Sequence, residues 1–276
     1  MELPTLSRFA LATAFSPRFL PGLAEAWRFA ARFQAAFSII HVGERTVEKE
    51  TILAEAMKHL SIPLETPMIW RTGNPVDELV QATGEESVDL LVAGALIRER
   101  EVSGRHFLGT VARGLLQRSP CSLLLLTKPQ VESRLYRRIA MVTDFTEGAR
   151  NALRAALALA ERDHCECLHV IAIRSPFDRA RSESVGQGGA TADRETLLDE
   201  FAEIAADSPV PIQPRVINSA TGVSAANFIT TVEADLLVVP TGASHGPTLL
   251  PPQMDWVSQV ISCDLWVVKK ASSREL

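Results

Sequence analysis

The amino-acid sequence predicts an α/β protein of two tandem domains, each built on a doubly wound parallel sheet. Three observations lead to this fold class. The chain has 276 residues, close to twice the length of an average domain. Short apolar runs without polar alternation, typical of strands covered on both faces, alternate with helical patterns. The same runs also occur twice in the same order.

The repeat consists of four pairs of matching segments. The pairs are Phe9–Ser16 with Ile139–Thr146, Ile39–Val42 with Cys167–Val170, Asp89–Gly94 with Asp235–Pro240, and Cys121–Leu126 with Cys263–Val268. Their shared order indicates a duplication, and their changing offset places the insertions in loops. We expect domains at residues 1–130 and 134–272, joined by a polar linker at Lys128–Arg134.

Amphipathic helices are predicted between the strands. After the first strand, Leu23 and Trp27 recur at helical spacing. In the second half, Thr146 is placed to cap a helix whose apolar face runs from Ala149 to Ala160. Strands that alternate with helices imply right-handed crossovers in a parallel sheet.

Charge and composition exclude several classes of partner and location. The net charge is −5 and neither half has a basic excess, so we expect no nucleic-acid partner. No apolar run approaches the roughly 18 residues of a membrane helix. The apolar run Phe9–Phe15 is broken by Ser16 and Pro17, which is unlike a secretory signal. Four cysteines without a disulfide or zinc spacing are expected to be reduced thiols in a cytoplasmic protein.

Two pairs of polar residues lie beside the repeated strands. His41 and His169 occupy matching positions in the repeat, and we interpret both as hydrogen-bonded structural histidines. Asp89 and Asp235 precede matching strands, where a solvated or capping role is expected.

Ligands of doubly wound sheets bind beyond the carboxyl ends of the strands, at the switch point of the strand order. In the first half these ends are followed by Ala14–Ser16 and by the loop from Gly94 to Thr110. Gly109 and Thr110 open a helical pattern, and the free N–H groups of a helix start attract anions. Arginines in the same loop offer further contacts to an anion.

The segment Phe107–Leu126 resembles the closing helix and last strand of universal stress proteins, and Asp144–Thr146 resembles the end of their first strand. The resemblance extends over both halves. It implies an adenine nucleotide alpha hydrolase-like fold with five parallel strands in the order 3-2-1-4-5. It also implies self-association through the last strands, within the chain as a pseudo-dimer or between chains as a homodimer. Nucleotide-binding members have an aspartate near the nucleoside. They also carry Gly, two residues, Gly, nine residues and then Gly with Ser or Thr, in a loop that cradles the phosphates of ATP.

The first half departs from this nucleotide-binding pattern. Gly94 and Gly109-Thr110 fit its ends, but Ile97 stands at the second glycine. Fourteen residues separate Gly94 from Gly109 where the family pattern has twelve. Ala14 replaces the aspartate.

The second half departs at other positions. It keeps Asp144, but Pro240 stands at the first glycine, Ala243 at the second, and Gln253-Met254 at the closing pair. A side chain obstructs the loop where the backbone must approach phosphate closely. We therefore expect no ordinary ATP site in this half.

The resemblance and these departures predict a tandem universal stress protein that acts in regulation and the stress response by binding, with degenerate nucleotide loops and no enzymatic activity. The alternative is an ATP-binding switch that uses the first domain, with Mg²⁺ as the accompanying ion. A third interpretation is an unrelated small ligand in a cavity shaped by Pro240 and the proline-rich loop after it. The candidate cofactor-binding residues are Gly94, Arg98, Gly104, Arg105, Gly109, Thr110 and Asp144.

A rival motif belongs to the serine hydrolases. Gly242, Ser244 and Gly246 match the G-x-S-x-G elbow, which requires a helix directly behind the serine. Three prolines follow within eight residues and argue against such a helix. No histidine occurs beyond His245, where the order of the triad demands one. We therefore do not expect a hydrolase.

Overall fold

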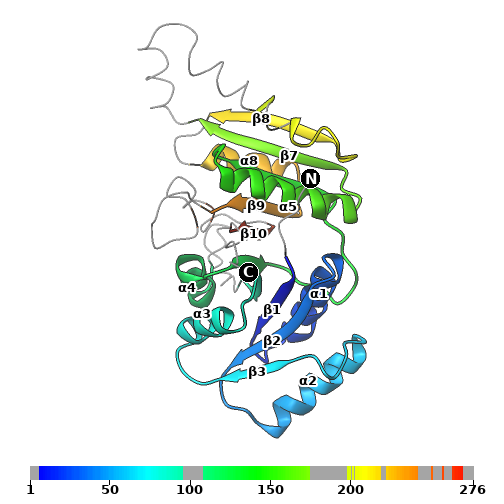
Figure 1. Cartoon of the computed structure of the whole chain (residues 1–276), viewed down its shortest axis with the longest axis vertical. Helices are drawn as coiled ribbons and strands as arrows, with labels where there is room; N and C mark the ends of the chain where they lie inside the picture. Colours follow the sequence, from blue (N-terminus) through cyan, green and yellow to red (C-terminus); the bar gives the residue numbers. More distant parts are fainter. Residues whose placement is uncertain are drawn as a thin grey trace, which may run out of the picture. The chain divides into compact units, whose positions relative to one another are not determined.

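The computed structural model describes residues 6–95, 108–174, 198–199, 201, 203–218, 222–241, 250, 257 and 263–269. These residues form two compact units (Figure 1). The N-terminal unit comprises residues 6–95 and 108–134, and the C-terminal unit comprises residues 135–269. No helix in the described part of the chain is both long enough and apolar enough to cross a membrane.

The N-terminal unit is a five-stranded parallel sheet with helices between the strands. Its strands pair in the order β3-β2-β1-β4-β5, which confirms the predicted order 3-2-1-4-5. The strands are β1 (Arg8–Thr13), β2 (Ala36–Val42), β3 (Met68–Arg71), β4 (Leu90–Gly94) and β5 (Ser122–Leu126). The helices are α1 (Phe19–Arg32), α2 (Val47–His59), α3 (Pro75–Glu85) and α4 (Thr110–Arg118).

Helices α2 and α3 of the N-terminal unit begin where short polar side chains cap them. Thr46 accepts a hydrogen bond from the backbone N–H of Lys49 and starts α2. Asn74 accepts from two N–H groups of the first turn of α3, and Pro75 supplies the favoured first helical residue. Helix α1 packs on β1 through aromatic side chains, with the ring centroids of Phe9 and Phe29 6.0 Å apart.

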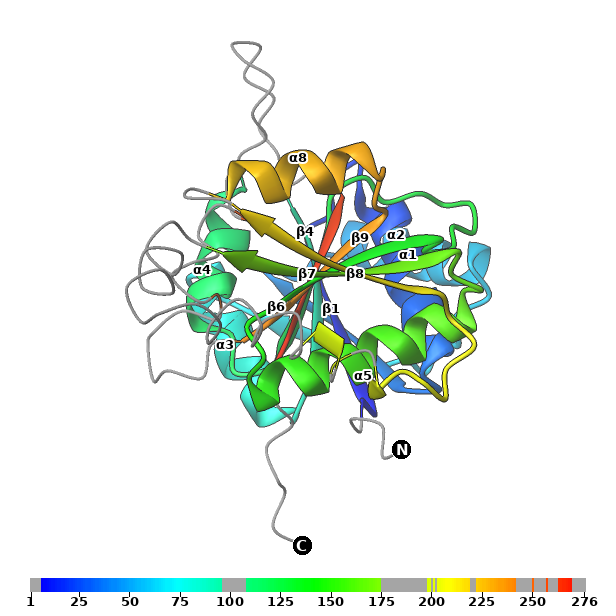
Figure 2. The ribbon, with the colours of Figure 1, turned by 90° about the horizontal axis from the view of Figure 1, so that it is seen from above.

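The C-terminal unit repeats this architecture. Its strands pair in parallel in the order β8-β7-β6-β9-β10. Figure 2 shows α5 and α8 on opposite faces of this sheet, as a doubly wound fold requires. The elements are β6 (Arg138–Thr143), α5 (Glu147–Arg162), β7 (Cys167–Arg174), β8 (Ile212–Asn218), α8 (Val223–Thr231), β9 (Leu236–Pro240) and β10 (Asp264–Val268).

The strand register corrects one of the four predicted sequence matches. His41 pairs with Thr13, the last residue of β1, whereas His169 pairs with Ala140 near the start of β6. The residue that pairs with the last residue of β6 is Ala172. The two histidines therefore do not occupy matching positions, and the counterpart of His41 is Ala172.

The aspartates before β4 and β9 have the capping role that the sequence predicts. In each unit, one carboxylate oxygen accepts hydrogen bonds of 2.9 Å from two consecutive backbone N–H groups at the start of the neighbouring strand. The donors are Ser7 and Arg8 for Asp89, and Arg137 and Arg138 for Asp235. The same contact in both units supports the duplication.

The predicted linker at Lys128–Arg134 has no helix or strand and is bound to α1. The Arg28 guanidinium donates to the carbonyl oxygen of Val131 at 2.6 Å and to those of Gln130 and Glu132 at 2.9 Å. Arg32, one helical turn later, donates to the carbonyl oxygen of Arg134 at 2.7 Å. The Nε of Arg134 donates to Glu25 of α1 at 3.1 Å. The linker segment is thus fixed to the N-terminal unit by charge-assisted hydrogen bonds.

Candidate functional site

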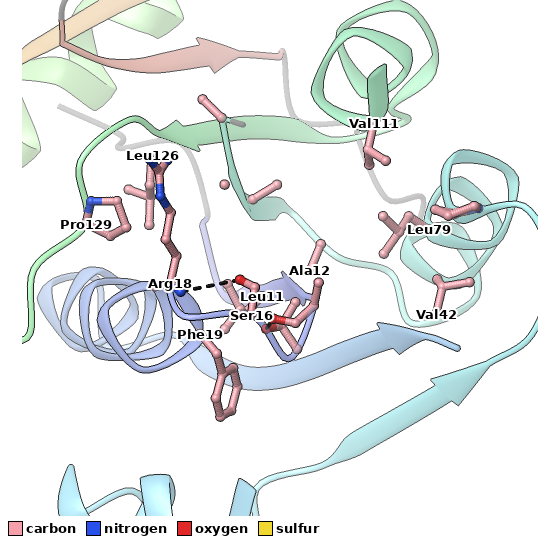
Figure 3. Close-up of a pocket in the computed structure, with 17 residues that line it drawn as sticks. Leu11, Ala12, Ser16, Arg18, Phe19, Val42, Leu79, Val111, Leu126 and Pro129 are labelled. Atoms are coloured by element: carbon pink, nitrogen blue, oxygen red, sulfur yellow. Dashed lines mark hydrogen bonds between the residues drawn. The ribbon is translucent and has the colours of Figure 1, made fainter. Parts of the chain in front are cut away.

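A cavity of about 250 Å³ lies in the N-terminal unit at the carboxyl ends of β1 and β4 (Figure 3). Residues 11–14 of β1 and its following turn form one wall, and residues 93–95 form another. The first turns of α1, α3 and α4 contribute Phe19, Pro75 and Val111. This place is the switch point of the strand order, where the sequence predicts the ligand site.

The cavity wall is mainly apolar. Among the described residues that line it, the side chains of Thr13, Ser16 and Arg18 carry the hydrogen-bonding groups. The Ser16 hydroxyl accepts a hydrogen bond from the backbone N–H of Arg18 at 3.3 Å, drawn as a dashed line in Figure 3. Arg18 supplies the only charged side chain among these described lining residues.

Backbone carbonyls at the rim of the cavity already have partners within the protein. The carbonyl oxygen of Thr13 lies 2.9 Å from Nδ1 of His41, and that of Ala14 accepts from Ser16 at 2.8 Å. The carbonyl oxygen of Leu126, at the end of β5, accepts from Ala95 at 2.8 Å. These contacts fix the turns that shape the cavity and occupy one of the two lone pairs of each carbonyl oxygen.

Gly94 stands at the end of β4, where the predicted loop begins. It lines the cavity, and a Cβ atom added there would meet no atom within 4 Å. Packing within the described chain therefore does not require glycine at this position. The missing side chain leaves space for a ligand to approach the backbone.

Helix α4 begins beside the cavity without a side-chain cap. Gly109 is its N-cap residue in extended conformation, Thr110 is exposed, and Val111 lines the cavity. Glycine has no side chain, so the N-cap residue itself offers no acceptor to the first N–H groups of the helix. Gly94 thus lines the cavity, and Gly109 and Thr110 directly precede the lining residue Val111 without being lining residues themselves. The other loop candidates, Arg98, Gly104 and Arg105, lie outside the described residues.

Asp144 belongs to the C-terminal unit and is not among the residues that line this cavity. Its Oδ1 accepts hydrogen bonds from the N–H of Thr146 at 3.1 Å and from the Thr146 hydroxyl at 2.6 Å. The same hydroxyl oxygen accepts from the N–H of Ala149 and caps α5, as predicted. Asp144 therefore shapes the turn from β6 into α5.

Pro240 occupies the position of Gly94 in the second sheet. Gly94 pairs with Leu126 at the end of β5, and Pro240 pairs with Val268 at the corresponding end of β10. Pro240 is buried, whereas Gly94 is exposed. The structure thus confirms the substitution at the first glycine position. The other second-half positions, including the hydrolase-like segment 242–246, lie outside the described residues.

An aromatic cluster beside the cavity was not predicted from the sequence. Phe15 stacks on Trp70 with ring centroids 6.0 Å apart, and His41 meets both rings edge-on. A carbonyl oxygen only accepts, so Nδ1 of His41 donates to Thr13, and Nε2 accepts from Lys49 at 3.4 Å. His41 is thus a hydrogen-bonded structural histidine that anchors the end of β1. A signal was available in the aromatic residues at the ends of β1 and β3.

In the C-terminal unit, Cys165, Cys167 and His169 have pKa values that burial shifts toward the uncharged form. Burial raises the pKa of the Cys165 and Cys167 thiols, so both remain protonated. Burial, followed by the nearby positive charge of Arg215, lowers the pKa of His169. Its ring meets Phe228 edge-on at 5.5 Å. Among the described residues, no group of three or more His, Cys, Asp or Glu side chains is placed to hold a metal ion.

Comparison with known proteins gives the family. The model of the universal stress protein family matches residues 43–127 and 135–269. A universal stress protein of Methanothermobacter thermautotrophicus is 32% identical over 90 residues, which span 31% of this chain and 59% of that relative.

Solved structures show the same fold. A universal stress protein from Archaeoglobus fulgidus has a TM-score of 0.68 at 17% identity, and the match covers 96% of this chain and 99% of that one. A protein of unknown function from Pseudomonas aeruginosa PAO1 has a TM-score of 0.70 at 17% identity, and the match covers 96% of this chain and 93% of that one. The family model covers most of both halves, and the two sheets have the strand order that the resemblance implied. This chain belongs to the universal stress protein family, with two family domains in tandem.

Proposed function

We propose that this chain is a regulatory protein that binds a small molecule in the cavity of the N-terminal unit and does not convert it chemically. The observation that carries this proposal is the cavity itself, which opens at the switch point between β1 and β4. The described lining residues include no carboxylate, histidine, cysteine or lysine that would act as a general acid or base. A wall without these groups suits the binding of a ligand better than its chemical conversion.

The two units support different roles at this edge of the sheet. In the N-terminal unit, Gly94 leaves open space at the cavity. In the C-terminal unit, Pro240 fills the corresponding position, and Asp144 is engaged by Thr146. We therefore assign ligand binding to the N-terminal unit.

A nucleotide is the second candidate ligand. Gly94 and the uncapped first turn of α4 favour it, because free N–H groups at a helix start suit phosphate. ATP bound there would bring Mg²⁺ with its phosphates. Against this candidate, Ala14 stands where nucleotide-binding relatives carry an aspartate.

The test uses a matched pair of glycine variants. At both Gly94 and Gly84, an added Cβ atom would meet no atom within 4 Å. Gly94 lines the cavity, whereas Gly84 lies in α3 and is not a lining residue. Gly94→Leu is expected to block the cavity without disturbing the fold, and Gly84→Leu is the control. Native mass spectrometry of the purified chain should show a small molecule on the wild type and on Gly84→Leu, but not on Gly94→Leu.

Calorimetric titration with ATP and Mg²⁺ separates the two candidates. Micromolar affinity that is lost in Gly94→Leu would establish the nucleotide switch. The binding proposal itself would be refuted if no molecule copurifies and no titrated compound binds. Retention of the bound molecule by Gly94→Leu would place the site elsewhere.

Family membership also supports a role in the stress response, a cytoplasmic location and self-association of the chain. Survival of a deletion strain under starvation or oxidative stress tests the first. Cell fractionation tests the second. Light scattering across a range of concentrations tests whether copies of the chain associate.

A further inference from the structure

The wall chemistry of the cavity defines a class of ligand. We infer that the cavity selects an amphipathic carboxylate of about eight to ten carbon atoms, with its apolar body inside and its carboxylate on Arg18. The inference rests on the proposed binding function of this cavity. It names a ligand class other than a nucleotide.

The volume sets the size of the apolar body. An apolar cavity of about 150 Å³ is known to hold benzene, which has six carbon atoms, so a cavity of about 250 Å³ has room for about ten. A chain of about eight to ten carbons therefore fills the space once its charged end reaches the rim. The body would contact Leu11, Val42, Leu79, Val111 and Leu126.

The same wall disfavours a nucleoside. Ribose hydroxyls and the edges of a base lose their water when buried and need partners in the protein. The described wall offers two side-chain hydroxyls, of which that of Ser16 already accepts a hydrogen bond from the backbone N–H of Arg18. The rim carbonyls of Thr13, Ala14 and Leu126 each have a partner within the protein. No described lining residue carries a carboxylate.

Arg18 supplies the charge that fixes the polar end of the ligand. It is exposed at the start of α1, and Figure 3 shows its side chain running toward Leu126 along one side of the cavity. Its guanidinium makes no hydrogen bond or ion pair with any residue that the structure describes. A guanidinium presents two parallel N–H donors that match the two oxygens of a carboxylate. The apolar wall and the Arg18 guanidinium, which has no partner among the described residues, together define an amphipathic anion.

Calorimetric titration of the full chain with decanoate, octanoate, octan-1-ol and adenosine tests the inference. Each methylene buried contributes about a factor of four in affinity, so decanoate should bind about fifteen times more tightly than octanoate. Octan-1-ol should bind at least about tenfold more weakly than octanoate, because it lacks the charge-assisted contact. Adenosine should not bind in the same concentration range.

Two arginine variants locate the anion. Arg18→Gln should weaken decanoate binding about tenfold and leave octan-1-ol unchanged. Arg8→Gln is the matched control, because Arg8 lies at the opposite end of β1. It should bind decanoate as the wild type does. Gly94→Leu should abolish binding of decanoate and octanoate, which distinguishes the cavity from adsorption on the surface.

The outcomes separate this inference from the proposed function. Adenosine or ATP binding more tightly than octanoate would overturn the amphipathic carboxylate and leave the binding function standing. Equal affinities for octanoate and octan-1-ol, or an unchanged Arg18→Gln variant, would overturn the role of Arg18. Failure of every probe, together with no copurifying molecule, would contradict the proposed function itself.

Discussion

Replacing Arg28 by alanine should release the linker segment from the N-terminal unit. The side chain donates three hydrogen bonds, of 2.6, 2.9 and 2.9 Å, to the carbonyl oxygens of Val131, Gln130 and Glu132. A partly exposed bond of this kind contributes about 1 kcal/mol, so the three together hold the segment with about 3 kcal/mol. This energy corresponds to about a hundredfold change in the local opening equilibrium.

Limited trypsin digestion measures this change. Trypsin cleaves after Arg134 only when the segment opens, and the rate of cleavage follows the open population when opening and closing are fast. Arg32 still holds the carbonyl oxygen of Arg134 in the variant, so about a hundredfold acceleration is the upper limit. Mass spectrometry identifies the products as one fragment ending at Arg134 and one beginning at Leu135.

Two comparisons make the result specific. Arg28→Lys keeps the charge, but a single ammonium does not reproduce the planar fork, so cleavage should lie between wild type and Arg28→Ala. The urea midpoint of the whole chain should change little, because the effect is local. An unchanged cleavage rate in Arg28→Ala would show that these hydrogen bonds do not hold the linker segment. A lower urea midpoint for the whole chain would show that Arg28 stabilises the global fold and not the linker segment alone.

Three further tests address the packing and electrostatics of the two units. Gly114→Ala places a Cβ atom 2.6 Å from Val76 of α3. In urea unfolding, this variant should lower the stability of the N-terminal unit by about 1–3 kcal/mol. Adding Val76→Ala in a double variant should restore the lost stability. Asp89→Ala and Asp235→Ala each leave two backbone N–H groups at the start of a strand without their acceptor. Each variant should lower the free energy of unfolding by about 1–2 kcal/mol. A decrease for only one of the two variants would contradict the equivalence of the two caps. The pKa of His169 in the folded state is lowered from its ordinary value of 6.5. The unfolded chain therefore takes up a proton at this histidine before the folded chain does, and stability is lost as the pH falls below 6.5. In urea unfolding, His169→Gln should lose less stability between pH 7 and 5 than the wild type does.

Strand positions were predictable because a strand covered on both faces must be apolar throughout. The run Asp89–Gly94 contains β4, and its repeat at Asp235–Pro240 contains β9. Register was less predictable. The match of His41 with His169 compared short apolar runs that each contain one histidine, and such runs slide against one another without violating any pattern. The register is fixed by the neighbouring strands, which the comparison of single segments did not include.

The candidate site and its surroundings were predictable only in part. Some of their contacts join residues that are neighbours in the sequence, and others join residues that are far apart in it. The spacing of Gly94 and Gly109 follows from the order of strand, loop and helix: Gly94 ends β4 and lines the cavity, whereas Gly109 is the N-cap residue of α4. The contacts of Arg28 with the linker segment join residues more than 100 positions apart. No local pattern encodes such a contact. The bonds between Asp144 and Thr146 are local, and the Asp-x-Thr sequence before a helix is a recognisable turn signal.

The two copies show why a duplicated sheet can divide its roles. The interior of each sheet must stay apolar and closely packed, so changes there cost stability in either copy. Residues just beyond the strands carry little of that packing, and Gly94 and Pro240 have diverged at the same register. Glycine there leaves a cavity open to a ligand, whereas proline fills the position and has no N–H group to offer one. Under the proposed function, the N-terminal copy binds the ligand, and the C-terminal copy has the same strand order with a different residue at this position.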